Sequence, residues 1–160
     1  MQLQIIPGYG HPEEIRRLFT EYTTLLTQGD PEFKKYLQIQ NYDEEIAHLE
    51  KKYGPPEGRL YLALADGKPA GCIALRKLNP AQCEMKRLYV RPEYRSLGIG
   101  KLLTQQILHD ARQIGYRQVM LDTFPFLERA IVMYRQLGFR ETGRYNDSPM
   151  ASTLYLVLEL

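Results

Sequence analysis

The sequence of 160 residues has no tryptophan and only two cysteines, Cys72 and Cys83. Two cysteines are too few for a disulfide framework or a four-cysteine zinc site. They lie in neighbouring predicted strands, where a bridge is geometrically conceivable, but two partly buried thiols in a reducing cytoplasm are the favoured interpretation. His11, His48 and His109 fall in unrelated segments without metal-ligand spacing, so we expect surface histidines and no metal.

The chain also lacks a strong charge imbalance and any long apolar run. Its 21 basic and 19 acidic residues give a net charge of +2, which is too small to favour nucleic acid or an anionic membrane as a partner. No apolar run approaches the ~18 residues of a membrane span, and residues 1–7 have neither the basic start nor the apolar core of a signal peptide. We therefore expect a soluble, intracellular protein with one domain, 1–160, large enough for a full core.

Hydrophobic periodicity predicts strands and helices that alternate along most of the chain. An Asp66-Gly67 pair between two apolar runs indicates a hairpin turn, and Gly115 is placed to cap a long helix. Strands are expected at 3–6, 59–65, 69–78, 83–90, 118–122 and 153–159, with a short one starting at Gly138. Helices are expected at 12–26, 44–53, 101–114 and 128–136, and 32–41 is ambiguous. The pattern predicts an α/β fold with a mixed sheet of six or seven strands and helices on both faces.

The most informative segment is the run 95–100, Arg-Ser-Leu-Gly-Ile-Gly, between a predicted strand and a predicted helix. Glycines at such a turn let backbone N–H groups converge on one point, and the helix start adds unpaired N–H groups and its dipole. With the charges of Arg95 and Lys101, this arrangement predicts a seat for a phosphate or pyrophosphate. An ordinary tight turn is the alternative. The spacing fits neither a Walker A loop, because Lys101 is followed by Leu102, nor a dinucleotide-binding fingerprint.

The wider run 84–100, Glu-Met-Lys-Arg-Leu-Tyr-Val-Arg-Pro-Glu-Tyr-Arg-Ser-Leu-Gly-Ile-Gly, resembles the pyrophosphate-binding motif of the GNAT superfamily of acetyl-CoA-dependent N-acetyltransferases. A second run, 130–139, is similar to the family's Ala-x-x-x-Tyr-x-x-x-Gly-Phe element. The resemblance is strong from about Gly71 to Phe139. It implies one GNAT domain, with two central parallel strands splayed to admit acetyl-CoA, and transfer of acetyl to a primary amine in a ternary complex. A homodimer through the C-terminal strands is a further expectation from the family.

The resemblance also implies which residues bind the cofactor and which one acts as the acid. Tyr134 occupies the family's position for the general acid, a task that suits a phenol with an unperturbed pKa of about 10; simple packing on the sheet is the alternative. Backbone groups are expected to hold the pantetheine arm and acetyl carbonyl at Leu88, Tyr89 and Val90. Backbone N–H groups are expected to hold the pyrophosphate at Arg95, Ser96, Leu97, Gly98, Ile99, Gly100 and Lys101.

The general base has three candidate assignments. Glu84 matches a strand glutamate used by some histone-type relatives, and Asp122 matches an acidic residue that other relatives carry on the following strand. Water could also deprotonate the amine with neither carboxylate. Both carboxylates could instead be solvent-facing or ion-pair partners of Lys86 and Arg87.

The acceptor is expected to bind at the variable parts of the chain: the first two helices, the loop 29–41 and the segment 145–149. Tyrosines and acidic side chains in these regions would suit a cationic amine; alternatively, they are ordinary residues of a surface or a dimer interface.

Many relatives have an asparagine that contacts the cofactor seven residues before the tyrosine. This chain has Leu127 there, after Phe124-Pro125-Phe126, which predicts an apolar edge to the cofactor groove. We favour a small or amino-acid-like amine over a protein terminus or lysine. A silent acetyl-CoA sensor and a purely structural module are the other classes. The aromatic and acidic residues are Tyr36, Tyr42, Tyr53, Tyr145, Asp43, Glu44, Glu45 and Asp147.

Overall fold

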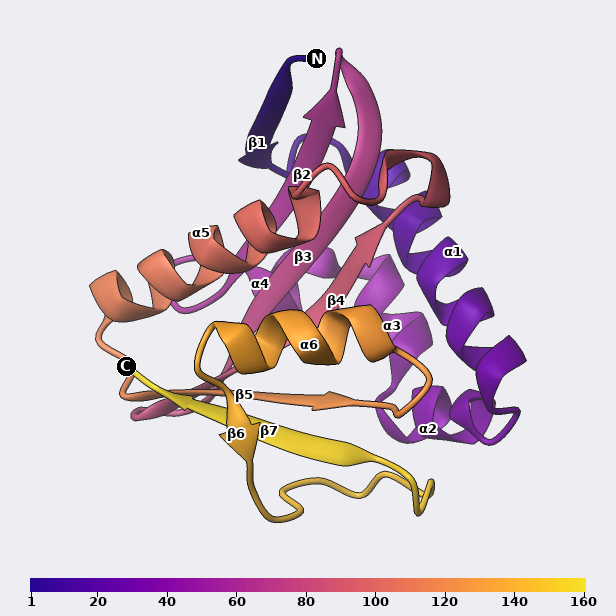
Figure 1. Ribbon diagram of the computed structural model, residues 1–160, viewed down its shortest axis with the longest axis vertical. Helices are drawn as coiled ribbons and strands as arrows, with labels where there is room; N and C mark the ends of the chain where they lie inside the picture. Colours follow the sequence, from indigo (N-terminus) through magenta and orange to yellow (C-terminus); the bar gives the residue numbers. More distant parts are fainter.

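The computed structural model describes residues 1–160 as one seven-stranded mixed sheet covered by six α-helices (Figure 1). The strand order is β1-β2-β3-β4-β5-β7-β6. The strands are β1 (Leu3–Pro7), β2 (Arg59–Ala65), β3 (Lys68–Asn79), β4 (Gln82–Val90), β5 (Gln118–Thr123), β6 (Arg140–Glu141) and β7 (Leu154–Glu159). The helices are α1 (Pro12–Gly29), α2 (Phe33–Ile39), α3 (Tyr42–Ala47), α4 (Leu49–Tyr53), α5 (Ile99–Ile114) and α6 (Glu128–Gln136), with a 3-10 turn at Pro92–Tyr94. The predicted α/β class and strand number are confirmed.

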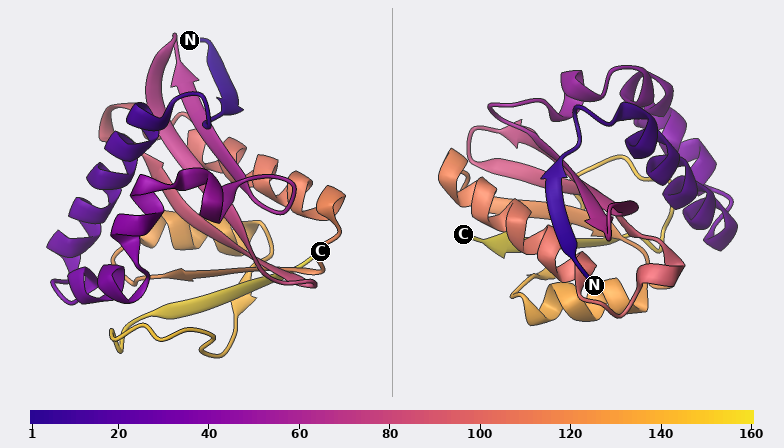
Figure 2. Two further views of the ribbon diagram at one scale, coloured as in Figure 1. Left: turned by 180° about the vertical axis from the view of Figure 1, so that it is seen from behind. Right: turned by 90° about the horizontal axis from the view of Figure 1, so that it is seen from above.

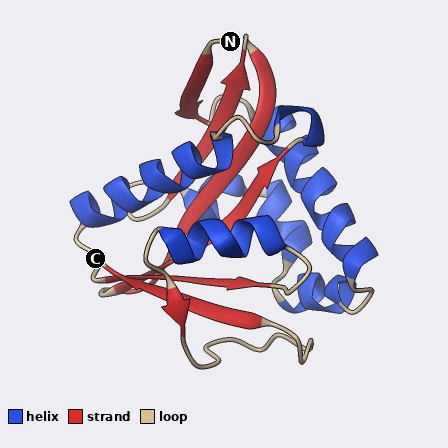
Figure 3. Cartoon of the chain, in the orientation of Figure 1, coloured by secondary structure: helices blue, strands red, loops and turns tan.

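The helices form two layers, with α5 and α6 on one face of the sheet and α1 to α4 on the other (Figures 1, 2 and 3). The alternation of side chains along β3 explains the two layers. Ile73 and Leu75 belong to the larger core cluster, with the apolar stripe of α5. Cys72 and Ala74 point the other way and join the cluster under α1 and α4.

Strands β4 and β5 lie side by side only at their beginning, and then diverge (Figure 1). Their parallel pairing covers Gln82–Glu84 against Gln118–Met120 and then stops. On its other edge β4 has a bulge, where the register with β3 shifts and Arg87 adopts a positive φ of 61°. A bulge bends and twists its strand, so the edge of β4 that faces β5 has no partner beyond Glu84. The splay implied by the family resemblance is present.

Local details differ from the sequence-based expectations at three places. The ambiguous segment contains helix α2, and the helix expected at 44–53 is two helices, interrupted at His48 with φ −136° and ψ 68°. Buried Glu45, Leu49 and Tyr53 keep helical spacing across the break, so the pattern could not reveal it. The return strand expected from Gly138 begins only at 140, because Gly138 has a φ of 104°.

The predicted hairpin turn and helix cap are present, and the two cysteines lie deeper than expected. Asp66 and Gly67 both have positive φ, as a tight hairpin turn requires, and Gly115 ends α5 in the left-handed conformation. Cys72 and Cys83 are free and more completely buried than expected. None of the helices combines the length and apolar composition needed to cross a membrane. No three histidine, cysteine or acidic side chains lie together in an arrangement that could hold a metal ion.

Candidate active site

The glycine turn presents a row of free backbone donors at the start of α5. Gly98 is the N-cap residue and has a φ of 81°, a conformation that glycine adopts without strain. The backbone N–H groups of residues 96–101 donate to no group of the turn or helix; the first helical bond runs from Leu102 to the Gly98 carbonyl. Arg95 and Lys101 are exposed beside them. Six free N–H groups and a helix dipole form an anion-binding seat.

Gly100 marks the point where this seat meets two neighbouring elements. A Cβ placed on Gly100 would lie 3.8 Å from Val90 Cγ2 on β4 and 4.0 Å from Met133 Sδ on α6. The seat therefore adjoins both the unpaired end of β4, with Leu88, Tyr89 and Val90, and the helix that carries Tyr134. The cofactor roles of these residues remain predictions, but the fold gathers their backbone groups at one edge.

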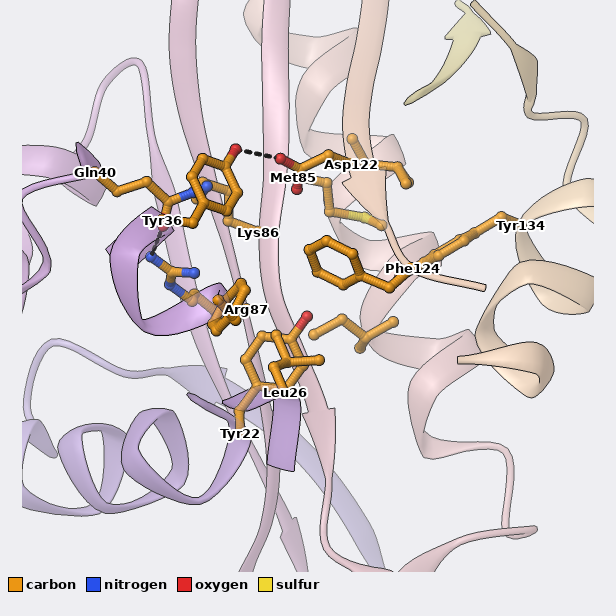
Figure 4. A pocket seen from close by; sticks show the side chains of 13 residues that line it. Tyr22, Leu26, Tyr36, Gln40, Met85, Lys86, Arg87, Asp122, Phe124 and Tyr134 are labelled. Atoms are coloured by element: carbon orange, nitrogen blue, oxygen red, sulfur yellow. Dashed lines mark hydrogen bonds between the residues drawn. The ribbon is translucent and has the colours of Figure 1, made fainter. Parts of the chain in front are cut away.

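A small cavity of about 20 Å³ lies where β4 and β5 diverge (Figure 4), inside a wider hollow that opens to solvent. Aromatic and aliphatic side chains form most of its wall; the charged side chains come from β4 and β5, and the one amide comes from Gln40, the residue that follows α2. The first helix and the segment 29–41, two of the regions expected to bind the acceptor, line the cavity, whereas the helix expected at 44–53 contributes no residue to it. Its lining residues are Tyr22, Leu26, Phe33, Tyr36, Gln40, Met85, Lys86, Arg87, Leu88, Leu121, Asp122, Phe124 and Tyr134.

Tyr134 lines this cavity from α6 and is almost completely buried. Its ring packs at 5.6 Å, centroid to centroid, against Phe139, whereas its hydroxyl makes no hydrogen bond within the chain. Burial raises the pKa of Tyr134 well above 10, and the nearby Tyr22 and Asp122 act in the same direction. The phenol therefore keeps its proton throughout the neutral range and is available as a proton donor.

Asp122 lines the same cavity near the end of β5 and faces Tyr36 (Figure 4). Tyr36 of α2 donates a short hydrogen bond to its Oδ2 atom, and Asn146 Nδ2 donates a second one at 2.8 Å. Oδ1 accepts no hydrogen bond. A half-buried carboxylate held by two neutral donors, with one oxygen free, can accept a proton or a hydrogen bond from an amine.

Glu84 is buried outside the cavity lining, and three polar side chains already surround its carboxylate. Its side chain is 2% exposed, and it accepts hydrogen bonds from Arg76 Nε at 2.7 Å and the Tyr145 hydroxyl at 2.6 Å, with Lys86 Nζ at 3.8 Å. Burial alone would raise its pKa, but Lys86, Arg76 and Tyr145 outweigh it and lower the pKa to about 2. Its stabilising contribution is therefore complete above the unfolded-state pKa of about 4.3 and is lost as pH falls towards 2.

The acidic residues expected to attract a cationic amine have other roles. Glu45 is buried and accepts two hydrogen bonds from Arg87 at 2.8 and 2.9 Å and one from Lys52 at 2.6 Å. The hydroxyl of Tyr53 donates to the same carboxylate at 2.9 Å, so both residues belong to a buried network. Asp43, Glu44, Asp147 and Tyr42 do not line the cavity either. Among the residues proposed for the acceptor, only Tyr36 lines it.

The apolar edge expected from the absence of asparagine at Leu127 is present in part. Phe124 lines the cavity and stacks on Phe126 at 5.9 Å. Sequence reasoning overlooked Tyr22, Phe33 and Gln40, and treated Lys86 only as an ion-pair partner. The one signal for Lys86 was its spacing: residues two apart on a strand share a face, so Glu84 and Lys86 had to point the same way.

Comparison with known proteins identifies the family. Residues 13–139 match the family model described as the acetyltransferase (GNAT) family. An uncharacterised N-acetyltransferase of Schizosaccharomyces pombe is 38% identical over 142 residues, which cover 88% of this chain and 87% of that protein. An acetyltransferase of Streptococcus agalactiae has a similar fold, with a TM-score of 0.77, 21% identity and coverage of 99% and 98%. The PaiA N-acetyltransferase of Thermoplasma acidophilum, solved with coenzyme A, has a TM-score of 0.76 at 18% identity, with both chains fully covered. The chain is thus a member of the GNAT family of acetyltransferases.

Proposed function

We propose that this protein transfers the acetyl group of acetyl-CoA to the primary amine of a small or amino-acid-like acceptor. The observation that carries the proposal is the row of six free N–H groups at the start of α5, which lies next to β4 and α6, two elements that contribute Leu88 and Tyr134 to the cavity. The Thermoplasma acidophilum neighbour was solved with coenzyme A, which supports the same donor for this chain.

The residues at the seat suit coenzyme A. Its pyrophosphate needs several converging donors and positive potential, and residues 96–101 supply both through the backbone and the helix dipole. Arg95 and Lys101 add charge from exposed positions. The edge of β4 that faces β5 has no neighbouring strand at Leu88, Tyr89 and Val90. Its free backbone groups can hydrogen-bond the pantetheine arm as they would otherwise bond a strand.

Bound acetyl-CoA supplies a thioester, and in the transfer a C–N bond forms, the C–S bond breaks, and the sulfur leaves as a thiolate that needs a proton. The chain provides one group to take the proton of the amine and another to protonate the departing sulfur. Asp122 holds the acceptor amine and takes its proton through the free Oδ1, and Tyr134 donates its phenolic proton to the departing sulfur.

Replacing Asp122 is expected to change the pH dependence of the reaction. Asp122→Asn should flatten the acidic limb of the kcat/KM profile and lower kcat/KM by about 10²-fold, the low end for loss of a general base. The comparison variant is Glu84→Gln, which removes the other candidate strand carboxylate, one that is buried outside the cavity and already held by Arg76 and Tyr145. Glu84→Gln should lower the melting temperature but leave the shape of the profile unchanged. An altered profile in Glu84→Gln alone would assign the base to Glu84.

A thermal-shift measurement tests the donor site directly. Acetyl-CoA and coenzyme A at about 1 mM should each raise the melting temperature, because a ligand at about 100 times its Kd adds about 2.7 kcal/mol of stability. ATP, which lacks the pantetheine arm, should raise it less. Thiol release with a panel of amines then separates a transferase from a silent acetyl-CoA sensor. If neither coenzyme A species shifts the melting temperature, the proposed donor is wrong.

A further inference from the structure

We propose that Lys86 binds the carboxylate of the acceptor, so that the substrate is an amino acid with a free α-carboxylate and an apolar side chain. This inference rests on the proposed function, because it names the substrate of the same cavity. It follows from the hydrogen bonding of one buried ammonium group.

Four cations surround the carboxylates of Glu45 and Glu84, and Lys86 is the one of them that has no hydrogen-bond partner within the chain. Arg87 and Lys52 both donate to Glu45, and Arg76 donates to Glu84. By contrast, the nearest carboxylate oxygen to Lys86 Nζ is Glu84 Oε1, at 3.8 Å. That distance is too long for a hydrogen bond, and Arg76 and Tyr145 already donate to the same carboxylate.

The position of this ammonium leaves its donors available to a ligand. The Lys86 side chain is only 5% exposed, but its nitrogen is not fully enclosed, since the buried side-chain polar atom without a partner is the Tyr42 hydroxyl. The three donors of the ammonium group can therefore bind a group that enters the cavity, which Lys86 lines. One bound anion with hydrogen-bond acceptors would satisfy these donors.

The register of the sheet places Lys86 across from Asp122. Gln82 pairs with Gln118 and Glu84 with Met120, so the same offset continued two residues further sets Lys86 opposite Asp122, where the strands have parted. Both side chains line the cavity (Figure 4). A cation and an anion that face each other across an opening match the carboxylate and the amino group of one amino acid.

The rest of the cavity defines the side chain of this substrate. Leu26, Phe33 and Phe124 are almost completely buried and form one apolar cluster at the wall. No charged group lies among them. With the carboxylate at Lys86 and the amine at Asp122, an apolar side chain would extend towards this cluster.

The first experiment compares two acceptors that differ only in the carboxylate. L-Phenylalanine and L-phenylalaninamide are supplied with saturating acetyl-CoA, and kcat/KM is measured over a range of pH and expressed per neutral amine, because the two amines titrate differently. The wild-type enzyme should prefer the carboxylate by about 10- to 100-fold, the value of a hydrogen bond to a charged group. L-Leucine and L-leucinamide repeat the test with a smaller side chain.

Lys86→Met should abolish this preference by lowering kcat/KM for the carboxylates only, and the KM for acetyl-CoA should not change. Lys86→Arg keeps the charge and should retain part of the preference. Lys51→Met is the matched control, since Lys51 is an exposed lysine on α4. Equal losses for acid and amide in Lys86→Met would show that Lys86 only supports Glu84. A wild-type preference for the amides would also overturn the proposal.

A binding measurement keeps the inference separate from the proposed function. N-Acetyl-L-phenylalanine and its amide are titrated into the coenzyme A-loaded protein by calorimetry, which needs no turnover. Binding of the acid that is lost in Lys86→Met would support the carboxylate site even if no amine were acetylated. Equal binding of acid and amide, or binding of neither, would overturn it.

Discussion

Gly100→Val should abolish coenzyme A binding and leave the protein folded. The backbone accepts a side chain here, because a Cβ on Gly100 would meet its nearest neighbours, Val90 Cγ2 and Met133 Sδ, at ordinary contact distances of 3.8 and 4.0 Å. The branched side chain would instead stand over the free N–H groups at the start of α5, where the pyrophosphate is expected. We expect Kd to rise at least about 100-fold, or about 2.8 kcal/mol.

Calorimetry with coenzyme A measures this effect, and the melting temperature reports on the fold. Leu97→Ala is the matched control in the same turn. The Leu97 side chain is exposed, and recognition there is expected through the backbone, so Leu97→Ala should bind coenzyme A with nearly wild-type affinity. An unchanged affinity in Gly100→Val would mean that the turn does not hold the cofactor.

Tyr134→Phe should lower kcat by about 10²- to 10³-fold, within the usual range for loss of a general acid. The substitution preserves the ring that packs on Phe139 and breaks no hydrogen bond within the chain, since the hydroxyl makes none. The melting temperature and the KM for acetyl-CoA should therefore stay close to wild type. Because burial raises the pKa of Tyr134, the wild-type enzyme should show no loss of rate from this group up to about pH 10, the unperturbed pKa of a phenol.

Steady-state kinetics of thiol release measure the effect, and Tyr116→Phe is the matched control. Tyr116 is also a buried core tyrosine, but its hydroxyl donates to the Glu57 carbonyl at 2.7 Å, away from the cavity. That variant should lose about 1 kcal/mol of stability and keep its kcat. A wild-type kcat in Tyr134→Phe would remove Tyr134 from the chemistry.

The features that the sequence determined are those encoded by neighbouring residues. The glycine turn and the start of α5 follow from six consecutive residues, because backbone freedom and the unpaired donors of a helix start are local properties. The alternation along β3 and the apolar stripe of α5 likewise carry their own periodicity. The fold class, the anion seat and the position of Tyr134 on α6 could therefore be predicted from the amino-acid sequence alone.

Only the tertiary structure decided which polar groups meet. Glu45 and Arg87 are 42 positions apart, Glu84 and Tyr145 are 61 apart, and no local pattern relates either pair. Their contacts depend on the bulge in β4, on the divergence of β4 from β5 and on the packing of α2 to α4, which are set by the whole chain. The same arrangement engages Glu84, leaves one oxygen of Asp122 free and leaves Lys86 without a hydrogen-bond partner. Electrostatic function depends on distances between groups, and those distances exist only in the folded chain.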